Sequence, residues 1–295
     1  MITDASLLMN PVLVGGTGRS GSTVVGHLLD HHRDLTLTRP MEVRFITGND
    51  GIVDALTVAM KKPDSKKARE AAKLAADRIR FRWYERAEHV GLHTSVPFDL
   101  LQGWVEQYLA DFAGDPERAS RTLVYQVMAA VARSVGATRW VDTTPANARK
   151  ADRVESIFPD SKVIIVTRDG RDVAASFVQQ TFGPDDVFEA LDQWEQRMLR
   201  AHRAELASRP GRVMSIELID LVARERLASL ERMCSFLEID VDPDMVDWFN
   251  THVTPVNAHV GRWRNQFDST TADQIDEYYE RICEKLASEG VKIPA

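Results

Sequence analysis

Hydrophobic positions along the chain fall into two kinds of segment. Short, continuous and largely β-branched runs predict buried strands of a parallel sheet that helices cover on both faces. The predicted strands occupy residues 12–15, 139–141, 163–166 and 213–216, of which 139–141 is a short strand that begins with a charged residue. The pattern from about residue 51 to residue 135 is instead helical, rich in alanine and charged, with a break at 62–65. Together these patterns predict an α/β fold, a single doubly wound domain over residues 1–295 with a helical insertion at about 51–135.

Two polar turns follow the first and third of these strands, and each turn is predicted to lead into a helix. The first turn reads Gly-Thr-Gly-Arg-Ser-Gly-Ser-Thr over residues 16–23, and the second reads Thr-Arg-Asp-Gly-Arg-Asp over residues 167–172. Such a turn directs backbone N–H groups and the positive end of a helix toward an anion. One turn of this kind binds one phosphate, so the pair suits a nucleotide that is phosphorylated at both ends of its ribose.

The first turn has three interpretations, of which the first is a Walker A loop. Gly16, Gly21 and Thr23 have the Walker A spacing, but Ser22 occupies the position of the lysine that binds the phosphates. A kinase or ATPase with this loop would therefore lack the cation that binds the phosphates. This P-loop-like sequence is therefore a weak match to an ATP-binding protein.

The second interpretation is the dinucleotide fingerprint of a nicotinamide-dependent oxidoreductase. Gly16, Gly18 and Gly21 have its spacing, and Glu42 follows at the distance expected of the ribose-binding acid. Arg19 lies inside the turn, where its charge suits a terminal anionic group better than a bridging pyrophosphate. The fingerprint also leaves the second turn unexplained, so it stands as the alternative.

The third interpretation is a loop that holds a 5′-phosphosulfate without a metal. Gly21 lets the backbone approach the ligand, Ser22 and Thr23 add hydroxyl donors, and Arg19 supplies a fixed charge. Here the sequence resembles the sulfotransferase superfamily, whose members use 3′-phosphoadenosine 5′-phosphosulfate. The Lys/Arg-Ser-Gly-Ser/Thr-Thr loop of that superfamily falls on Arg19, Ser20, Gly21, Ser22 and Thr23.

Matches further along the chain extend the resemblance. The superfamily motif for the 3′-phosphate, Arg-x-x-Arg/Lys-Asp-Val-x-x-Ser, falls on residues 168–176, from Arg168 to Ser176. Residues 140–145 are similar to its Trp-x-x-Lys-Thr-Pro segment, and residues 261–267 are similar to its late Gly-x-Trp-Lys/Arg-Asn-x-Phe loop. The matches cover residues 11–46, 139–180 and 212–267 and leave the helical insertion uncovered.

The resemblance implies a role for each matched residue. The residues expected to bind the donor nucleotide are Gly18, Arg19, Ser20, Gly21, Ser22, Thr23, Arg168, Ser176, Arg262, Trp263 and Arg264. Arg19 is also expected to stabilise charge on the leaving phosphate, and no metal is required. Glu42 resembles the Glu-x-Arg element of the tyrosylprotein-type branch and is the candidate base, with an ion pair to Arg39 or Arg44 as its alternative role.

The sequence departs from the superfamily pattern at positions that concern catalysis. Thr143 replaces the lysine of the Lys-Thr-Pro element, so Thr143 itself, Arg19 or Lys150 must take over its role. Pro145 replaces the histidine base of the cytosolic aryl and steroid members. A nucleotide-binding protein without transferase activity is therefore a further alternative.

Composition limits the partners and the location. The chain has 37 Lys+Arg against 44 Asp+Glu and a formal charge of -7, so bulk attraction to nucleic acid is not expected. Its two cysteines have no zinc-site spacing, and no run is long enough to span a membrane. The N-terminus lacks a basic leader, so a cytoplasmic protein is expected.

The acceptor has no motif of its own. The expected acceptor is a hydroxyl group of a small molecule, glycan or lipid, and the helical insertion is expected to contribute to its site. An aromatic and basic stretch at 80–84, followed by His89 and His93, is the candidate lining. The sequence identifies neither the acceptor nor the oligomeric state.

Overall fold

A sheet of five parallel strands organises the part of the chain that the computed structural model describes, residues 10–85, 91–135 and 139–294. The strands are β1 (Val12–Gly16), β2 (Leu35–Leu37), β3 (Arg139–Asp142), β4 (Lys162–Thr167) and β5 (Val213–Glu217). They lie in the order β2-β3-β1-β4-β5. The predicted α/β fold and its four predicted strands are confirmed. The pattern does not predict β2, because its 3 residues form too short an apolar run.

Helices account for most of the remaining described chain. Before β3 these are α2 (Ser22–Asp30), α3 (Arg44–Thr47), α4 (Ile52–Lys61), α5 (Lys66–Asp77), η1 (Arg78–Trp83), η2 (Leu92–Thr94), α6 (Phe98–Phe112) and α7 (Pro116–Val135). After β3 these are η3 (Pro145–Lys150), α8 (Ala151–Val154), α9 (Gly170–Phe177), α10 (Val187–Ala207), η4 (Asp220–Arg224), α11 (Arg226–Leu237), α12 (Pro243–His252), η5 (Arg262–Asn265) and α13 (Ser269–Ser288).

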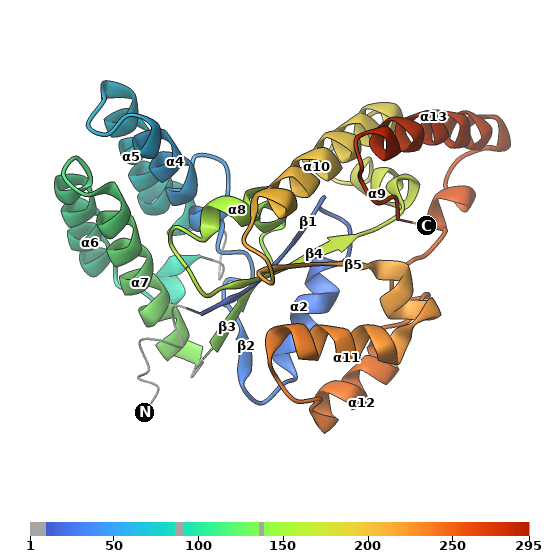
Figure 1. Cartoon of the computed structure of the whole chain (residues 1–295), viewed down its shortest axis with the longest axis horizontal. Coiled ribbons are helices and arrows are strands. Elements are labelled where there is room, and N and C mark those ends of the chain that lie inside the picture. The colour runs from blue at the N-terminus through green and yellow to red at the C-terminus, as the bar shows by residue number, and fades with distance from the viewer. Residues whose placement is uncertain (1–9, 86–90, 136–138, 295) are drawn as a thin grey trace.

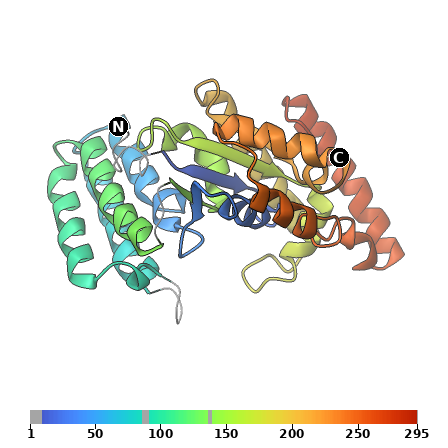
Figure 2. The ribbon, with the colours of Figure 1, turned by 90° about the horizontal axis from the view of Figure 1, so that it is seen from below.

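Both faces of the sheet are covered, as a parallel sheet requires (Figures 1 and 2). Val12 and Val14 point to the face that α2, α11 and α12 cover. Leu13 points to the opposite face, where its core continues into helices α4 to α7. β1 and β4 therefore present apolar side chains on both faces of the sheet, which is why each is a continuous apolar run rather than an alternating one.

Helices α4 to α7 stand together beside the sheet, at the left of Figure 1. The break predicted at 62–65 is present: α4 ends at Lys61, and Ser65 caps α5 by accepting a hydrogen bond from the Ala68 N–H at 3.1 Å. Tyr108 and Phe112 of α6 are buried in edge-to-face contact. These helices thus share a core with the sheet and extend it on one side.

The sheet brings the two polar turns together. β1 and β4 are direct neighbours, in register from Val12 beside Lys162 to Gly16 beside Val166. Because both strands are parallel, they end at the same edge, and the turn after each one lies beside the other. In the dinucleotide-binding fold, the strand that follows the first helix pairs with the first strand, whereas here β3 lies between β1 and β2. The strand order therefore argues against the oxidoreductase alternative.

Candidate functional site

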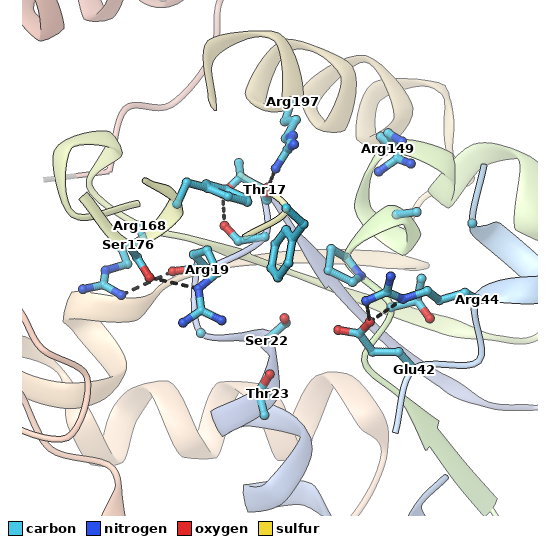
Figure 3. Close-up of a pocket in the computed structure, with 18 of the residues that line it drawn as sticks. Thr17, Arg19, Ser22, Thr23, Glu42, Arg44, Arg149, Arg168, Ser176 and Arg197 are labelled. Carbon is cyan, nitrogen blue, oxygen red and sulfur yellow. Dashed lines mark hydrogen bonds and ion pairs between the residues drawn. The ribbon is translucent and has the colours of Figure 1, made fainter. Parts of the chain in front are cut away.

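A cleft of about 780 Å³ opens at the carboxyl ends of the strands. Its walls come from the turn after β1, the segment after β2, the helical insertion, η3, α9, α10 and the loop before η5. Ligands of open α/β sheets bind at this edge. Figure 3 shows the side chains that point into it.

The turn after β1 has a backbone shaped for close approach to a ligand. Gly18, Arg19 and Gly21 all have positive φ, of 80°, 58° and 102° respectively. A side chain on Gly21 would also collide, since its Cβ would lie 2.8 Å from Leu218 Cδ1. α2 begins at Ser22, so its first N–H groups face the cleft, which Ser22 and Thr23 also line. Ser20 is the exception among the predicted residues of this loop, because its side chain is fully buried and absent from the cleft lining.

The second motif contacts the first directly. Arg19 Nε donates a hydrogen bond to Ser176 Oγ at 2.9 Å (Figure 3). Arg168 donates to the Arg19 carbonyl at 3.3 Å, and Asp169 caps α9 by accepting from the Arg171 N–H at 2.8 Å. Arg168 and Ser176, eight residues apart in the sequence, thus face one site with Arg19.

The late loop is held against the second motif by one buried carboxylate. Asp172 accepts hydrogen bonds from the backbone N–H groups of Gly261 at 2.8 Å and Trp263 at 3.3 Å, and it forms an ion pair with Arg168 at 3.3 Å. Arg262 lines the cleft, while Arg264 lies outside the main cleft with its guanidinium 4.5 Å from the Trp263 ring centroid. Trp263, also expected to bind the nucleotide, is buried and absent from the lining of the main cleft.

Arg171 has a structural role in this arrangement. It forms ion pairs with Asp169 at 2.6 Å and with Asp276, and its guanidinium lies between the rings of Trp263 and Tyr279 at 4.8 and 4.5 Å. These contacts tie α9 to α13 and to the late loop.

Glu42 lines the opposite side of the cleft from Arg168 (Figure 3). It accepts a hydrogen bond from Arg44 Nε at 2.6 Å, so it is ion-paired and also reachable from the cleft. The adjacent Val43 N–H donates to the buried carboxylate of Asp142 at 2.7 Å. Asn147 donates to the same carboxylate at 2.8 Å, and burial raises the pKa of Asp142 to about 6. Asp142 therefore anchors the segment that presents Glu42.

Comparison with known proteins agrees with this geometry. The sequence matches the sulfotransferase family over residues 11–243, which is most of the chain. The chain belongs to this family. A search of curated proteins gave no significant match.

Two solved sulfotransferase structures show the shared fold of the family. The sulfotransferase domain of the Synechococcus PCC 7002 olefin synthase is 17% identical, with a TM-score of 0.55 over 94% of this chain and 95% of that domain. The sulfotransferase domain of the curacin biosynthetic pathway is 16% identical, with a TM-score of 0.52 over 97% of this chain and 99% of that domain. At these identities the likeness concerns the fold.

Three residues, Thr143, Lys150 and Arg19, are the candidates to take over the role of the lysine that Thr143 replaces. Thr143 is buried and donates its hydroxyl proton to the Met41 carbonyl at 3.1 Å. Lys150 donates to Asp54 at 2.7 Å and to the Gly48 carbonyl at 3.0 Å. Neither side chain lines the cleft, so the expectation is wrong for both, and Arg19 is the member of the original three that does line it.

The structure adds arginines to this candidate site that the sequence does not indicate. Arg149 of η3, together with Arg197 and Arg200 of α10, lines the cleft. Arg197 donates to the Thr17 carbonyl at 2.6 Å and so contacts the first loop (Figure 3). No motif surrounds these residues, because their meeting depends on the packing of α10 against η3.

Of the stretch expected to line the acceptor site, some described residues lie in the cleft and others do not. Arg82 and Trp83 line the cleft, whereas His93 bonds to the Tyr84 carbonyl at 2.9 Å through Nδ1. His89 lies outside the described residues. Within those residues, no group of three or more His, Cys, Asp or Glu side chains is placed to bind a metal, and no helix is long and apolar enough to cross a membrane.

Proposed function

We propose that this protein transfers a sulfuryl group from 3′-phosphoadenosine 5′-phosphosulfate to an acceptor hydroxyl. The observation that carries the proposal is the direct contact between the two phosphate-binding motifs, with Arg19 bonded to Ser176 at 2.9 Å and Arg168 bonded to the Arg19 carbonyl at 3.3 Å. A ligand with two phosphate groups on one ribose would span such a pair. The sulfotransferase family match over residues 11–243 supports the reaction class.

The donor end of the cleft has one set of groups for each phosphate. The N–H groups at the start of α2, the Ser22 hydroxyl and the Arg19 guanidinium would bind the 5′-phosphosulfate. Arg168 and Ser176 would bind the 3′-phosphate. As the bond from sulfur to the phosphate oxygen breaks, negative charge grows on the leaving phosphate, and the fixed charge of Arg19 stabilises it.

The proton of the acceptor hydroxyl requires a base. Glu42 lies in the cleft lining, across from Arg168, and its segment is anchored by the Asp142 carboxylate through the Val43 N–H at 2.7 Å. We propose Glu42 for this role, with Arg44 orienting its carboxylate. The acceptor is a hydroxyl of a small molecule, glycan or lipid, and the insertion contributes Arg78, Arg82 and Trp83 to its side of the cleft.

Calorimetric titration with 3′,5′-adenosine bisphosphate, the desulfated product, tests the donor site. We expect micromolar or tighter binding, at least tenfold weaker in Arg19→Ala, and no binding of NADH or NADPH. Arg118→Ala is the matched control, because Arg118 is exposed and pairs only locally with Asp115 at 3.5 Å. Binding of a dinucleotide without a response to the bisphosphate would refute the proposal. Transfer of ³⁵S from the labelled donor to any acceptor then separates a transferase from a protein that only binds the nucleotide.

A further inference from the structure

The cleft is strongly cationic, although the chain as a whole carries a formal charge of -7. Among described residues its lining contains nine arginines, namely Arg19, Arg44, Arg78, Arg82, Arg149, Arg168, Arg197, Arg200 and Arg262. The same lining contains only two carboxylates, Glu42 and Asp50. Both carboxylates are already occupied, Glu42 by Arg44 and Asp50 by Arg78. Positive charge in the cleft therefore exceeds what its own acids neutralise.

The proposed donor accounts for only part of this charge. Arg19 and Arg168 serve its two phosphates, and Arg262 lies beside them. Arg149 lies elsewhere: in Figure 3 it is on the Glu42 side of the cleft, and Arg168 is on the other side. Arg149 thus adds positive charge on the side of the candidate base, apart from the residues assigned to the two phosphates.

Arg149 and Arg197 interact electrostatically with each other and with Arg200, and these three cleft-lining residues are called here the arginine cluster. Arg149 donates to the Asn49 amide oxygen at 2.8 Å, and Arg197 donates to the Thr17 carbonyl at 2.6 Å. These partners are neutral. In the described part of the chain, no member of the cluster forms an ion pair with a carboxylate.

Asp54 offsets the charge of Arg149 only in part. Asp54 influences Arg149, but its carboxylate is bound to Lys150 at 2.7 Å and accepts the Asp50 N–H at 3.0 Å. Burial, and then the charges of neighbouring arginines, lowers the pKa of both Arg149 and Arg197. Like charges held together in a partly buried cleft repel one another, and a bound anion removes that repulsion.

We propose that the arginine cluster is an anion subsite that binds a carboxylate, phosphate or sulfate group carried by the acceptor. The proposal rests on the proposed transferase function and narrows its substrate class to hydroxyl compounds that are themselves anionic. Guanidinium groups suit such a ligand, because each presents a planar fork of donors to two oxygens. Arg197 also bonds to the first loop, so the subsite adjoins the place where the phosphosulfate would bind.

The experiment measures binding of a second anion to protein that is saturated with 3′,5′-adenosine bisphosphate. Pyrophosphate is the phosphate probe and succinate is the carboxylate probe, and both are titrated calorimetrically at fixed low ionic strength. We expect at least one probe to bind, with affinity about tenfold weaker in Arg149→Gln and in Arg200→Gln. The stronger probe identifies the preferred anionic group.

A matched control is available on the same helix. Arg203 of α10 is exposed, outside the cleft lining, and pairs with Glu289 at 3.4 Å. Arg203→Gln removes the same charge one turn away, so it should leave the affinity for the probe within about twofold. Arg197 is not used as the main variant, because its loss would also release the Thr17 carbonyl.

Each result decides between the proposals. Failure of both probes to bind the saturated protein, or equal affinities in Arg149→Gln, Arg200→Gln and Arg203→Gln, overturns the anion subsite and leaves the donor site intact. Failure of the bisphosphate itself to bind refutes the donor site instead. The probes are then titrated into the free protein, where the same dependence on Arg149 and Arg200 is required and its absence overturns the subsite.

Discussion

Replacement of Arg168 by alanine tests how the cleft recognises the donor. In the structure this guanidinium donates to the carbonyl oxygens of Arg19 at 3.3 Å and His259 at 2.9 Å, and it pairs with Asp172 at 3.3 Å. It therefore has two roles to separate. One is the proposed binding of the 3′-phosphate, and the other is holding the first loop and the late loop in place.

The expected loss of affinity follows from the charge and burial of this side chain. A hydrogen bond to a charged group contributes about 1.5–3 kcal/mol, and a guanidinium supplies two of them to a phosphate. The Arg168 side chain is 10% exposed, so solvent screens it little, but the nearby Asp172 carboxylate offsets part of the attraction. We take about 3 kcal/mol as the net value, which is roughly a hundredfold in affinity.

The assay is a thermodynamic cycle that compares the binding free energies of two proteins for two ligands. Wild type and Arg168→Ala are each titrated calorimetrically with 3′,5′-adenosine bisphosphate and with 5′-AMP, which lacks the 3′-phosphate. Affinity for the bisphosphate should fall roughly a hundredfold, whereas affinity for 5′-AMP should fall less than about threefold. Arg168→Lys keeps the charge without the planar fork and should lose about tenfold.

Equal losses for both ligands would refute the reasoning. That outcome would mean that Arg168 acts only by holding the Arg19 carbonyl and the late loop. Thermal unfolding of both variants provides the control, because Asp172 loses its cation but keeps its two backbone N–H donors at 2.8 and 3.3 Å. If a variant unfolds in one cooperative transition with little change in Tm, its loss of affinity reflects the lost contact with the ligand alone.

Three further predictions concern the base, the loop and a buried acid. Glu42→Gln should lower the single-turnover rate of sulfuryl transfer at least about a hundredfold, with affinity for the bisphosphate within about twofold; an unchanged rate would exclude Glu42 as the base. Gly21→Ala should lower the free energy of unfolding by about 1–3 kcal/mol in urea denaturation, because φ is 102° and the new Cβ would lie 2.8 Å from Leu218 Cδ1. Asp142→Asn should change the pH dependence of stability: burial raises the pKa of Asp142 to about 6, so wild type should lose up to about 3 kcal/mol relative to the variant between pH 4 and pH 7.

The sign of the Asp142 effect follows from where the proton is held. Between about pH 4 and pH 6 the unfolded chain has released this proton, whereas the folded protein still binds it. Rising pH therefore favours the unfolded state through this group, and the amide of the Asp142→Asn variant has no such proton to lose. A stability difference that stays constant from pH 4 to pH 7 would contradict the raised pKa. For Gly21→Ala, wild-type stability would contradict the need for a left-handed glycine.

The sequence predicts four of the strands and the two polar turns because both are local features. β1 and β4 are continuous apolar runs, each followed at once by a polar turn and a helix. β2 has 3 residues and carries no such signal. The contact between Arg19 and Ser176 is beyond local prediction, because it depends on β1 and β4 being neighbours in the sheet.

The replacement for the missing lysine shows the same limit. Thr143 and Lys150 are close in sequence to the expected position, but the fold turns Thr143 toward the Met41 carbonyl and Lys150 toward Asp54. The side chains that do line the cleft there come from η3 and α10. Closeness in sequence to a motif therefore does not determine which side chain lines the cleft.

A physical difference between the two ends of the cleft explains why only one of them leaves a motif. A phosphate at a helix N-terminus is bound by N–H groups of consecutive residues, so the chain must supply a fixed local conformation and small side chains such as Gly21. An anion held by guanidinium groups needs only side chains that reach one cleft, and Arg149 and Arg197 line the cleft from separate helices, η3 and α10. Many sequences satisfy the second requirement and few satisfy the first. The acceptor chemistry of a sulfotransferase therefore has to be inferred from charges that the fold brings together.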